Sequence, residues 1–245
     1  MKRFLVTGIA LLAAAQLHAA ETPDTKAVVA ELMNKYAQTS GLAANLEIRY
    51  QTGQEESVAT STLAVSRKYG WKLEDFTPGR EHRIVNDFTV MYQYFPREAR
   101  VLKMVADEPG MAAAFRKPAE ELNPLSSLDP TSVKLIGQEM LNSEPTYHFA
   151  GTTQTQMLEM GQPAMRAMEV WLGTNDGLPR KTVEKSGDVV MTTVYRDVKV
   201  NPDFKAEDFR FSAPAGVEVL DMNEQISAAS RSEAAPTTAP AKNAP

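Results

Sequence analysis

The spacing of apolar residues changes along this chain from a helical period to a strand period. Between Thr22 and Gly41 apolar residues recur every three or four positions. This spacing predicts one amphipathic helix that starts at Thr22-Pro23 and ends at Gly41. Its apolar stripe, which serves either a core or a cavity, consists of Val28, Val29, Leu32, Met33 and Tyr36. After the helix the period falls to two, which predicts strands.

Short strands then follow one another with short turns between them. The turns contain Gly, Pro, Asn or Asp, and no helix separates neighbouring strands, so the pattern predicts an antiparallel meander. A sheet of this size usually curls. The ten or eleven expected strands cover residues 45–51, 58–66, 69–76, 83–85, 88–95, 100–105, 133–137, 146–151, 167–172, 180–185 and 189–200.

Two segments interrupt the strand pattern. Prolines punctuate residues 108–131, where we expect two short helices at 111–115 and 119–122. Residues 152–165 carry Met157, Met160 and Met165 together with Gly and Pro, which predicts a mobile loop with a Met-rich face. The fold class expected from these elements is mainly β (α+β).

The two ends of the chain differ in composition from the middle. Residues 1–19 combine a basic start, an apolar run over 4–15 and a small-residue cleavage site, which indicates a signal peptide and hence a periplasmic protein. A buried N-terminal helix is the alternative. Residues 223–245 are rich in Ala, Pro, Ser and Thr, which predicts a flexible tail. One domain is therefore expected over residues 20–222.

Composition and charge argue against several kinds of site. The chain has no cysteine, three histidines and a net charge of −5, which disfavours thiolate metal sites and nucleic-acid binding. No nucleophile elbow, phosphate loop or dinucleotide fingerprint is present. We therefore expect His82 and His148 to be structural and Glu74, Asp75 and Glu81 to lie on a solvated face. No catalytic residue, metal ligand or cofactor is predicted.

The C-terminal third carries an ordered set of motifs. It contains Glu169-Val170-Trp171-Leu172, Gly177-Leu178-Pro179-Arg180-Lys181, Tyr195 to Pro202, Phe209-Arg210-Phe211 and Pro214-Ala215-Gly216-Val217. In this order the motifs resemble the LolA/LolB-like superfamily of periplasmic lipoprotein carriers. Leu63 to Arg67 and Asn86 to Pro96 agree more loosely, and Lys68 stands where the carriers have Pro.

The resemblance implies a strongly curved, half-open antiparallel β-barrel with a helical lid over a hydrophobic cavity for acyl chains. Arg67 matches the arginine that holds the lid through hydrogen bonds to helix residues; an ordinary solvent-exposed arginine is the alternative. The residues expected to line the cavity, unless they only pack a core, are Leu46, Ile48, Tyr50, Leu63, Val65, Trp71, Tyr92 and Trp171.

Three functional hypotheses follow. The leading one is a monomeric periplasmic carrier or chaperone that binds lipoprotein acyl chains or free lipid for transfer toward the outer membrane, between an inner-membrane donor complex and an outer-membrane receptor. The second is a regulatory module of the cell envelope that senses lipid or lipoprotein. The third is an enzyme that uses its histidines, for which the sequence offers no positive signal.

Overall fold

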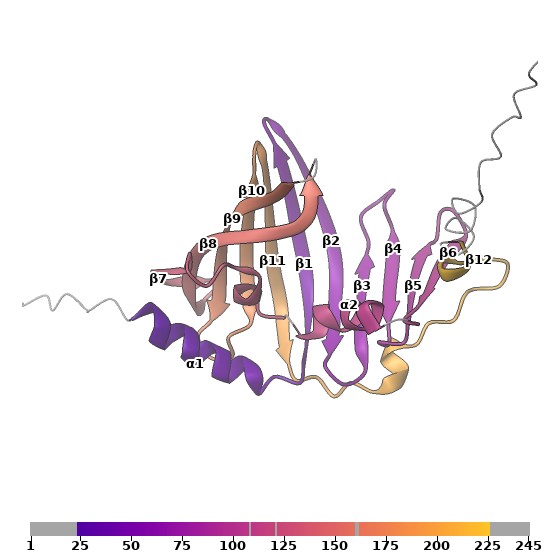
Figure 1. Cartoon of the computed structure of the whole chain (residues 1–245), viewed down its shortest axis with the longest axis horizontal. Helices are drawn as coiled ribbons and strands as arrows, with labels where there is room; N and C mark the ends of the chain where they lie inside the picture. The colour runs from indigo at the N-terminus through magenta and orange to yellow at the C-terminus, as the bar shows by residue number, and fades with distance from the viewer. Residues whose placement is uncertain (1–23, 108, 121, 160–161, 226–245) are drawn as a thin grey trace, which may run out of the picture.

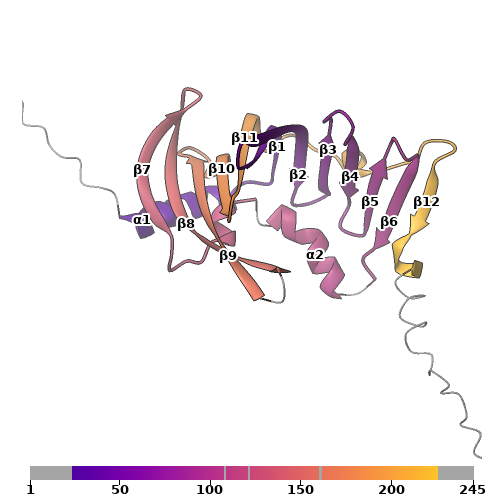
Figure 2. The same cartoon turned by 90° about the horizontal axis from the view of Figure 1, so that it is seen from above.

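A single open sheet runs through most of the chain. The computed structural model describes residues 24–107, 109–120, 122–159 and 162–225. Within them, twelve strands form one sheet in the order β12-β6-β5-β4-β3-β2-β1-β11-β10-β9-β8-β7. The sheet is curved and does not close, so β12 and β7 are its two free edges (Figures 1 and 2). This is the predicted half-open, mainly β fold.

The helical elements are α1 (Thr25–Ala37), α2 (Pro109–Glu120) and the short 3-10 turns η1 (Pro124–Ser127) and η2 (Ala206–Phe209). The strands are β1 (Gly41–Thr52), β2 (Glu55–Ser66), β3 (Gly70–Asp75), β4 (His82–Asn86), β5 (Val90–Phe95), β6 (Arg100–Val105), β7 (Lys134–Leu141), β8 (Glu144–Glu159), β9 (Gln162–Gly173), β10 (Pro179–Ser186), β11 (Val189–Val200) and β12 (Glu218–Asp221).

Helix α1 confirms the predicted stripe but not the predicted ends. Its buried residues are Val28, Leu32 and Tyr36. The helix begins after Asp24, whose carboxylate accepts a hydrogen bond from the Lys26 backbone N–H at 3.3 Å. Thr22 and Pro23 lie outside the described residues. The helix ends at Ala37, and Gln38 caps it. Gly41, the predicted end of the helix, is instead the first residue of β1.

The segment predicted as a mobile loop is a strand pair instead. β8 and β9 continue as an antiparallel hairpin, and the backbones of Gln154 and Met165 and of Glu159 and Gln162 face each other across it. The end of this hairpin passes in front of β11 and β1 (Figure 1). The side chains of Met157, Met160 and Met165 lie outside the described part of the chain.

Helix α2 replaces the two short helices expected over 111–122. It runs without a break from Pro109 to Glu120 and includes Pro118. A proline inside a helix removes one backbone N–H donor. Here it lies within the last turn, so the preceding turns keep their hydrogen bonds, while Phe115 and Ala119 are buried.

The C-terminal residues add a strand that the sequence pattern did not reveal. β12 pairs with β6 in parallel, so the sheet is mixed rather than purely antiparallel. The Asn223 side chain accepts from the Val105 N–H at 2.8 Å and donates to the Val105 carbonyl at 2.9 Å. Asn223 therefore belongs to the fold, a correction to the predicted tail start. The rest of that tail, from 226, and the predicted signal peptide lie outside the described residues.

None of the helices that the structure describes is long and apolar enough to cross a membrane.

Candidate ligand-binding face

Both helices pack against one face of the sheet, here called the inner face; the opposite face is the outer face (Figures 1 and 2). One hydrophobic cluster joins α1 to the β7–β9 side of the sheet: Val28, Leu32, Leu125, Leu128, Leu135, Phe149, Met168, Val170 and Leu172. A second cluster joins the end of α1 and α2 to β1 and β2: Tyr36, Leu42, Ala44, Leu46, Val65, Phe88, Ala119, Leu122 and Leu178.

Six of the eight predicted lining residues share the inner face. Cross-strand partners lie on the same face of a sheet, and residues two apart on one strand do as well. Leu46, Ile48 and Tyr50 therefore lie together on β1. On the neighbouring strands Leu63 pairs with Ala44, and Val65 pairs with both Leu42 and Trp71.

Tyr92 and Trp171 lie on the outer face, which corrects their assignment to the same lining. Tyr92 pairs with Val85, and its ring lies 5.2 Å from that of Phe211 in the C-terminal segment. Trp171 stacks on His148 at 4.0 Å and lies under the Lys181 ammonium at 4.2 Å. The sequence prediction did not consider which face of its strand each aromatic residue occupies. The register of the strands places Tyr92 and Trp171 on the outer face.

The inner face becomes less buried from the helices toward β6. Under the helices Leu42 and Val65 are each 1 % exposed. On β3–β6 most inner-face residues are half-buried, and the apolar ones among them include Trp71, Leu73, Ile84, Met91, Leu102 and Met104. The polar residues Asp75 and Asn86 lie on the same face and are buried. The sequence reasoning missed most of the apolar ones, because apolar residues occupy both faces of these strands and the alternation is weak.

Helix α2 is fixed over this half-buried region by hydrogen bonds. The Trp71 indole Nε1–H donates to the Phe115 carbonyl of α2 at 2.9 Å. Beyond the helix, the Leu122 N–H donates to the Tyr36 hydroxyl at 2.9 Å, and that hydroxyl donates to the Glu120 carbonyl. Tyr36 therefore links the end of α1 to the end of α2.

Arg67 makes the contact with α1 that the resemblance implied. Its guanidinium donates to the carbonyls of Tyr36 at 3.2 Å and Ala37 at 3.3 Å, the last turn of the helix. It also lies 4.4 Å from the centroid of the Tyr36 ring, within cation–π range. A cation at a helix C-terminus also interacts favourably with the helix dipole. The alternative of a purely solvated arginine does not hold.

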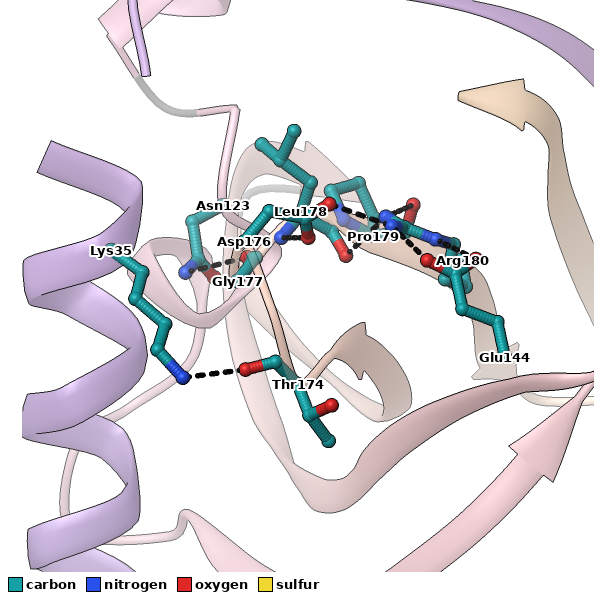
Figure 3. Close-up of polar contacts among 9 residues, drawn as sticks. All are labelled: Lys35, Asn123, Glu144, Thr174, Asp176, Gly177, Leu178, Pro179 and Arg180. Carbon is teal, nitrogen blue, oxygen red and sulfur yellow. Dashed lines mark hydrogen bonds and ion pairs between the residues drawn. The ribbon is translucent and has the colours of Figure 1, made fainter. Parts of the chain in front are cut away.

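The turn between β9 and β10 fastens the C-terminal half of α1 (Figure 3). Lys35 donates to the Thr174 carbonyl at 2.6 Å, and Asn123 donates to the Gly177 carbonyl at 3.4 Å. Behind the turn, the buried Arg180 makes two bonds to Glu144 at 2.6 and 2.7 Å and one to Asp176 at 2.7 Å. Hydrogen bonding from Arg180 lowers the pKa of Glu144.

The two histidines of the described residues serve structural contacts. The His148 ring contacts Glu139 at 2.8 Å and Glu169 at 3.2 Å on the outer face. His82 lies 3.7 Å from Asp75. Among the described residues no group of His, Asp and Glu is arranged to hold a metal ion. The inner face of β3–β6 offers mainly apolar contact area.

The sequence matches no protein-family model and no curated protein. The fold is similar to that of an uncharacterised conserved protein from Thermus thermophilus, with a TM-score of 0.52 and 12 % identity over 80 % of this chain and 98 % of that one. Two further similar structures are the MucA/MucB complex of Pseudomonas aeruginosa (TM-score 0.47, 14 % identity, 78 % of this chain and 62 % of that one) and a LolA superfamily protein from Nitrosomonas europaea (0.40, 10 %, 76 % and 97 %).

At these identities the likenesses concern the fold alone. An open curved sheet with helices along one face, as the sequence motifs led us to expect, is the fold of this chain.

Proposed function

We propose that this protein is a periplasmic carrier that binds the acyl chains of lipoproteins or free lipids on the inner face of its sheet and shields them on the way to the outer membrane. The observation that carries the proposal is the half-buried apolar inner face of β3–β6, beside α2. Burial of each methylene there contributes about 0.8 kcal/mol, so even one long acyl chain supplies ample affinity.

The arrangement of the helices supports the same proposal. Both helices are tied to the sheet through few polar contacts: Arg67 and Lys35 hold α1, and the Trp71 indole holds α2. Breaking a small number of hydrogen bonds costs little net free energy, about 1 kcal/mol each. Helix α2, which buries only Phe115 and Ala119, is the part of the cover that such a fastening allows to move aside for a ligand. The expected signal peptide supports the periplasmic location.

Neighbouring residues of β3 that point to opposite faces provide the test. Leu73 lies on the inner face and Lys72 on the outer face. Leu73→Gln should weaken the uptake of a fluorescent fatty-acyl probe about tenfold, whereas Lys72→Gln should bind like the wild type. Native mass spectrometry of protein taken from cells should show co-purified lipid. Protein repeatedly free of lipid that also takes up no probe would rule out carriage.

Crosslinking in cells separates carriage from sensing. A carrier should crosslink to many lipoproteins in turn, with each contact made by inner-face positions. Crosslinking to a single membrane regulator, and to no lipoprotein, would instead establish the regulatory module as the function.

A further inference from the structure

Four polar side chains interrupt the apolar inner face at its centre. Thr182 and Glu184 belong to β10, and Thr193 and Tyr195 belong to the adjacent strand β11. Thr182 and Thr193 are direct cross-strand partners. Because residues two apart on a strand share a face, all four project from the same side; we call them the polar strip.

The register fixes the polar strip between the two hydrophobic clusters. On one side, Thr182 pairs with Val170 and Glu184 pairs with Met168, both members of the cluster under α1. On the other side, Thr193 pairs with Ile48 and Tyr195 pairs with Leu46, which belong to or pack against the second cluster. A ligand that lies across the inner face therefore meets apolar, polar and again apolar surface.

Glu184 is a half-buried carboxylate without a partner in the fold. In the part of the chain that the structure describes, it makes no hydrogen bond or ion pair, whereas the outer-face Glu47 is paired with Arg49 and Arg196. Carboxylates in apolar surroundings are stable when they are hydrogen-bonded or paired. The environment of Glu184 also affects Tyr195: burial, and to a smaller extent the Glu184 charge, raise the pKa of Tyr195 to about 12.

We propose that the polar strip binds the polar group of the ligand, and that Glu184 selects amphiphiles whose polar group donates hydrogen bonds, such as an amine or a hydroxyl, over fatty acids. A carboxylate only accepts hydrogen bonds, so it complements a donor and repels a second carboxylate. The three hydroxyls of the strip serve either role. This inference rests on the proposed function, because it assigns the head-group chemistry of the ligand bound there.

Three probes of equal chain length test the proposal: an alkylamine, a fatty alcohol and a fatty acid, each displacing one fluorescent lipid from the full-length protein. The wild type should bind the amine and the alcohol about tenfold more tightly than the acid. Glu184→Gln should remove most of this preference, chiefly by strengthening acid binding. Glu47→Gln changes the net charge equally on the outer face and should leave the preference unchanged.

A second variant tests the polar strip even if Glu184→Gln fails to fold. Tyr195→Phe keeps the ring and removes a hydroxyl that can donate to or accept from any of the three head groups, so it should weaken the binding of all three probes severalfold while the preference set by Glu184 remains. Preference of the wild type for the acid would overturn the proposal. Equal binding of all three probes would also overturn it and leave the carrier function intact. Binding of none of them would instead contradict the carrier function.

Discussion

At the residue scale, the position of α1 depends on the absence of a side chain at Gly177. Gly177 has a φ of +71° in the β9–β10 turn, and a Cβ there would lie 2.7 Å from the Leu32 carbonyl oxygen. Glycine adopts this conformation without strain, and its small size lets the turn approach the helix. The same turn supplies the Thr174 and Gly177 carbonyls that Lys35 and Asn123 bind (Figure 3).

Gly177→Ala should therefore destabilise the protein more than backbone strain alone. The left-handed conformation costs an alanine about 1–2 kcal/mol, and the collision with the Leu32 carbonyl adds to it. Gly187→Ala is the matched control, because Gly187 has a φ of +56° and open space around its Cβ position. Urea unfolding of both variants measures the difference. Equal losses would mean that the contact between the turn and α1 contributes nothing.

Tyr195 should lose its proton at a higher pH than an ordinary tyrosine. Its pKa of about 12 lies above the ordinary value of 10.0 because burial disfavours the phenolate, with Glu184 adding to the effect. The difference in absorbance at tyrosinate wavelengths between wild type and Tyr195→Phe should have its midpoint near pH 12. The unfolded chain releases this proton near pH 10, so the contribution to stability is full below pH 10 and is lost between pH 10 and 12. A midpoint near pH 10 would contradict the buried site.

At the element scale, the helices are held by contacts from different strands. α1 is bound by Arg67 after β2 and by the turn after β9, whereas α2 is bound by Trp71 of β3. Tyr36 connects the two helix ends through its hydroxyl. None of these contacts is a hydrogen bond between strands, so loosening the helices would leave the pairing of the sheet intact.

Replacing Arg67 should loosen α1 selectively. Arg67→Met keeps the apolar stem and removes the two hydrogen bonds to the helix end, with an expected cost of about 1–2 kcal/mol. Hydrogen exchange of the α1 amides should become about tenfold faster, because 1.4 kcal/mol corresponds to a factor of ten. The adjacent Lys68→Met serves as the control, since the Lys68 ammonium lies over the Tyr69 ring and makes no hydrogen bond to α1 in the described structure. Unchanged exchange in α1 would remove Arg67 from the attachment of the helix.

At the scale of the whole molecule, the two faces of β3–β6 are covered by different parts of the chain. The C-terminal segment covers the outer face, where Phe211 contacts Tyr92 and Tyr94 and where Val101 is fully buried. Phe209, 1 % exposed, lies in the same segment. With the outer face covered in this way, the inner face is the one that α2 packs against.

Phe209→Ala should therefore reduce the stability of the entire fold. Truncation of a fully buried phenylalanine costs about 3–5 kcal/mol. Phe76 is 53 % exposed, so Phe76→Ala should stay within about 0.5 kcal/mol of the wild type. Chemical unfolding followed by circular dichroism measures both. Similar losses in the two variants would show that the C-terminal segment does not hold the outer face.

The local pattern in the sequence determined most of the element types and the shared face of Leu46, Ile48 and Tyr50. β6 and β11 begin and end where the alternation predicts, and the α1 stripe is buried as its helical spacing requires. These features depend on neighbours a few residues apart, which the sequence displays directly. The parity of strand β1 likewise placed Leu46, Ile48 and Tyr50 together.

Only the tertiary structure decided which face is which. Tyr92 and Trp171 look like lining residues until the register assigns them to the outer face, and β12 pairs with β6 across more than a hundred residues of chain. The polar strip likewise emerges only when β10 and β11 are aligned between the two clusters. The alternation of residues along a strand specifies that two sets of side chains lie on opposite faces of the sheet. Which set meets helices, a C-terminal segment or a ligand depends on contacts between residues distant in sequence, and no local pattern encodes them.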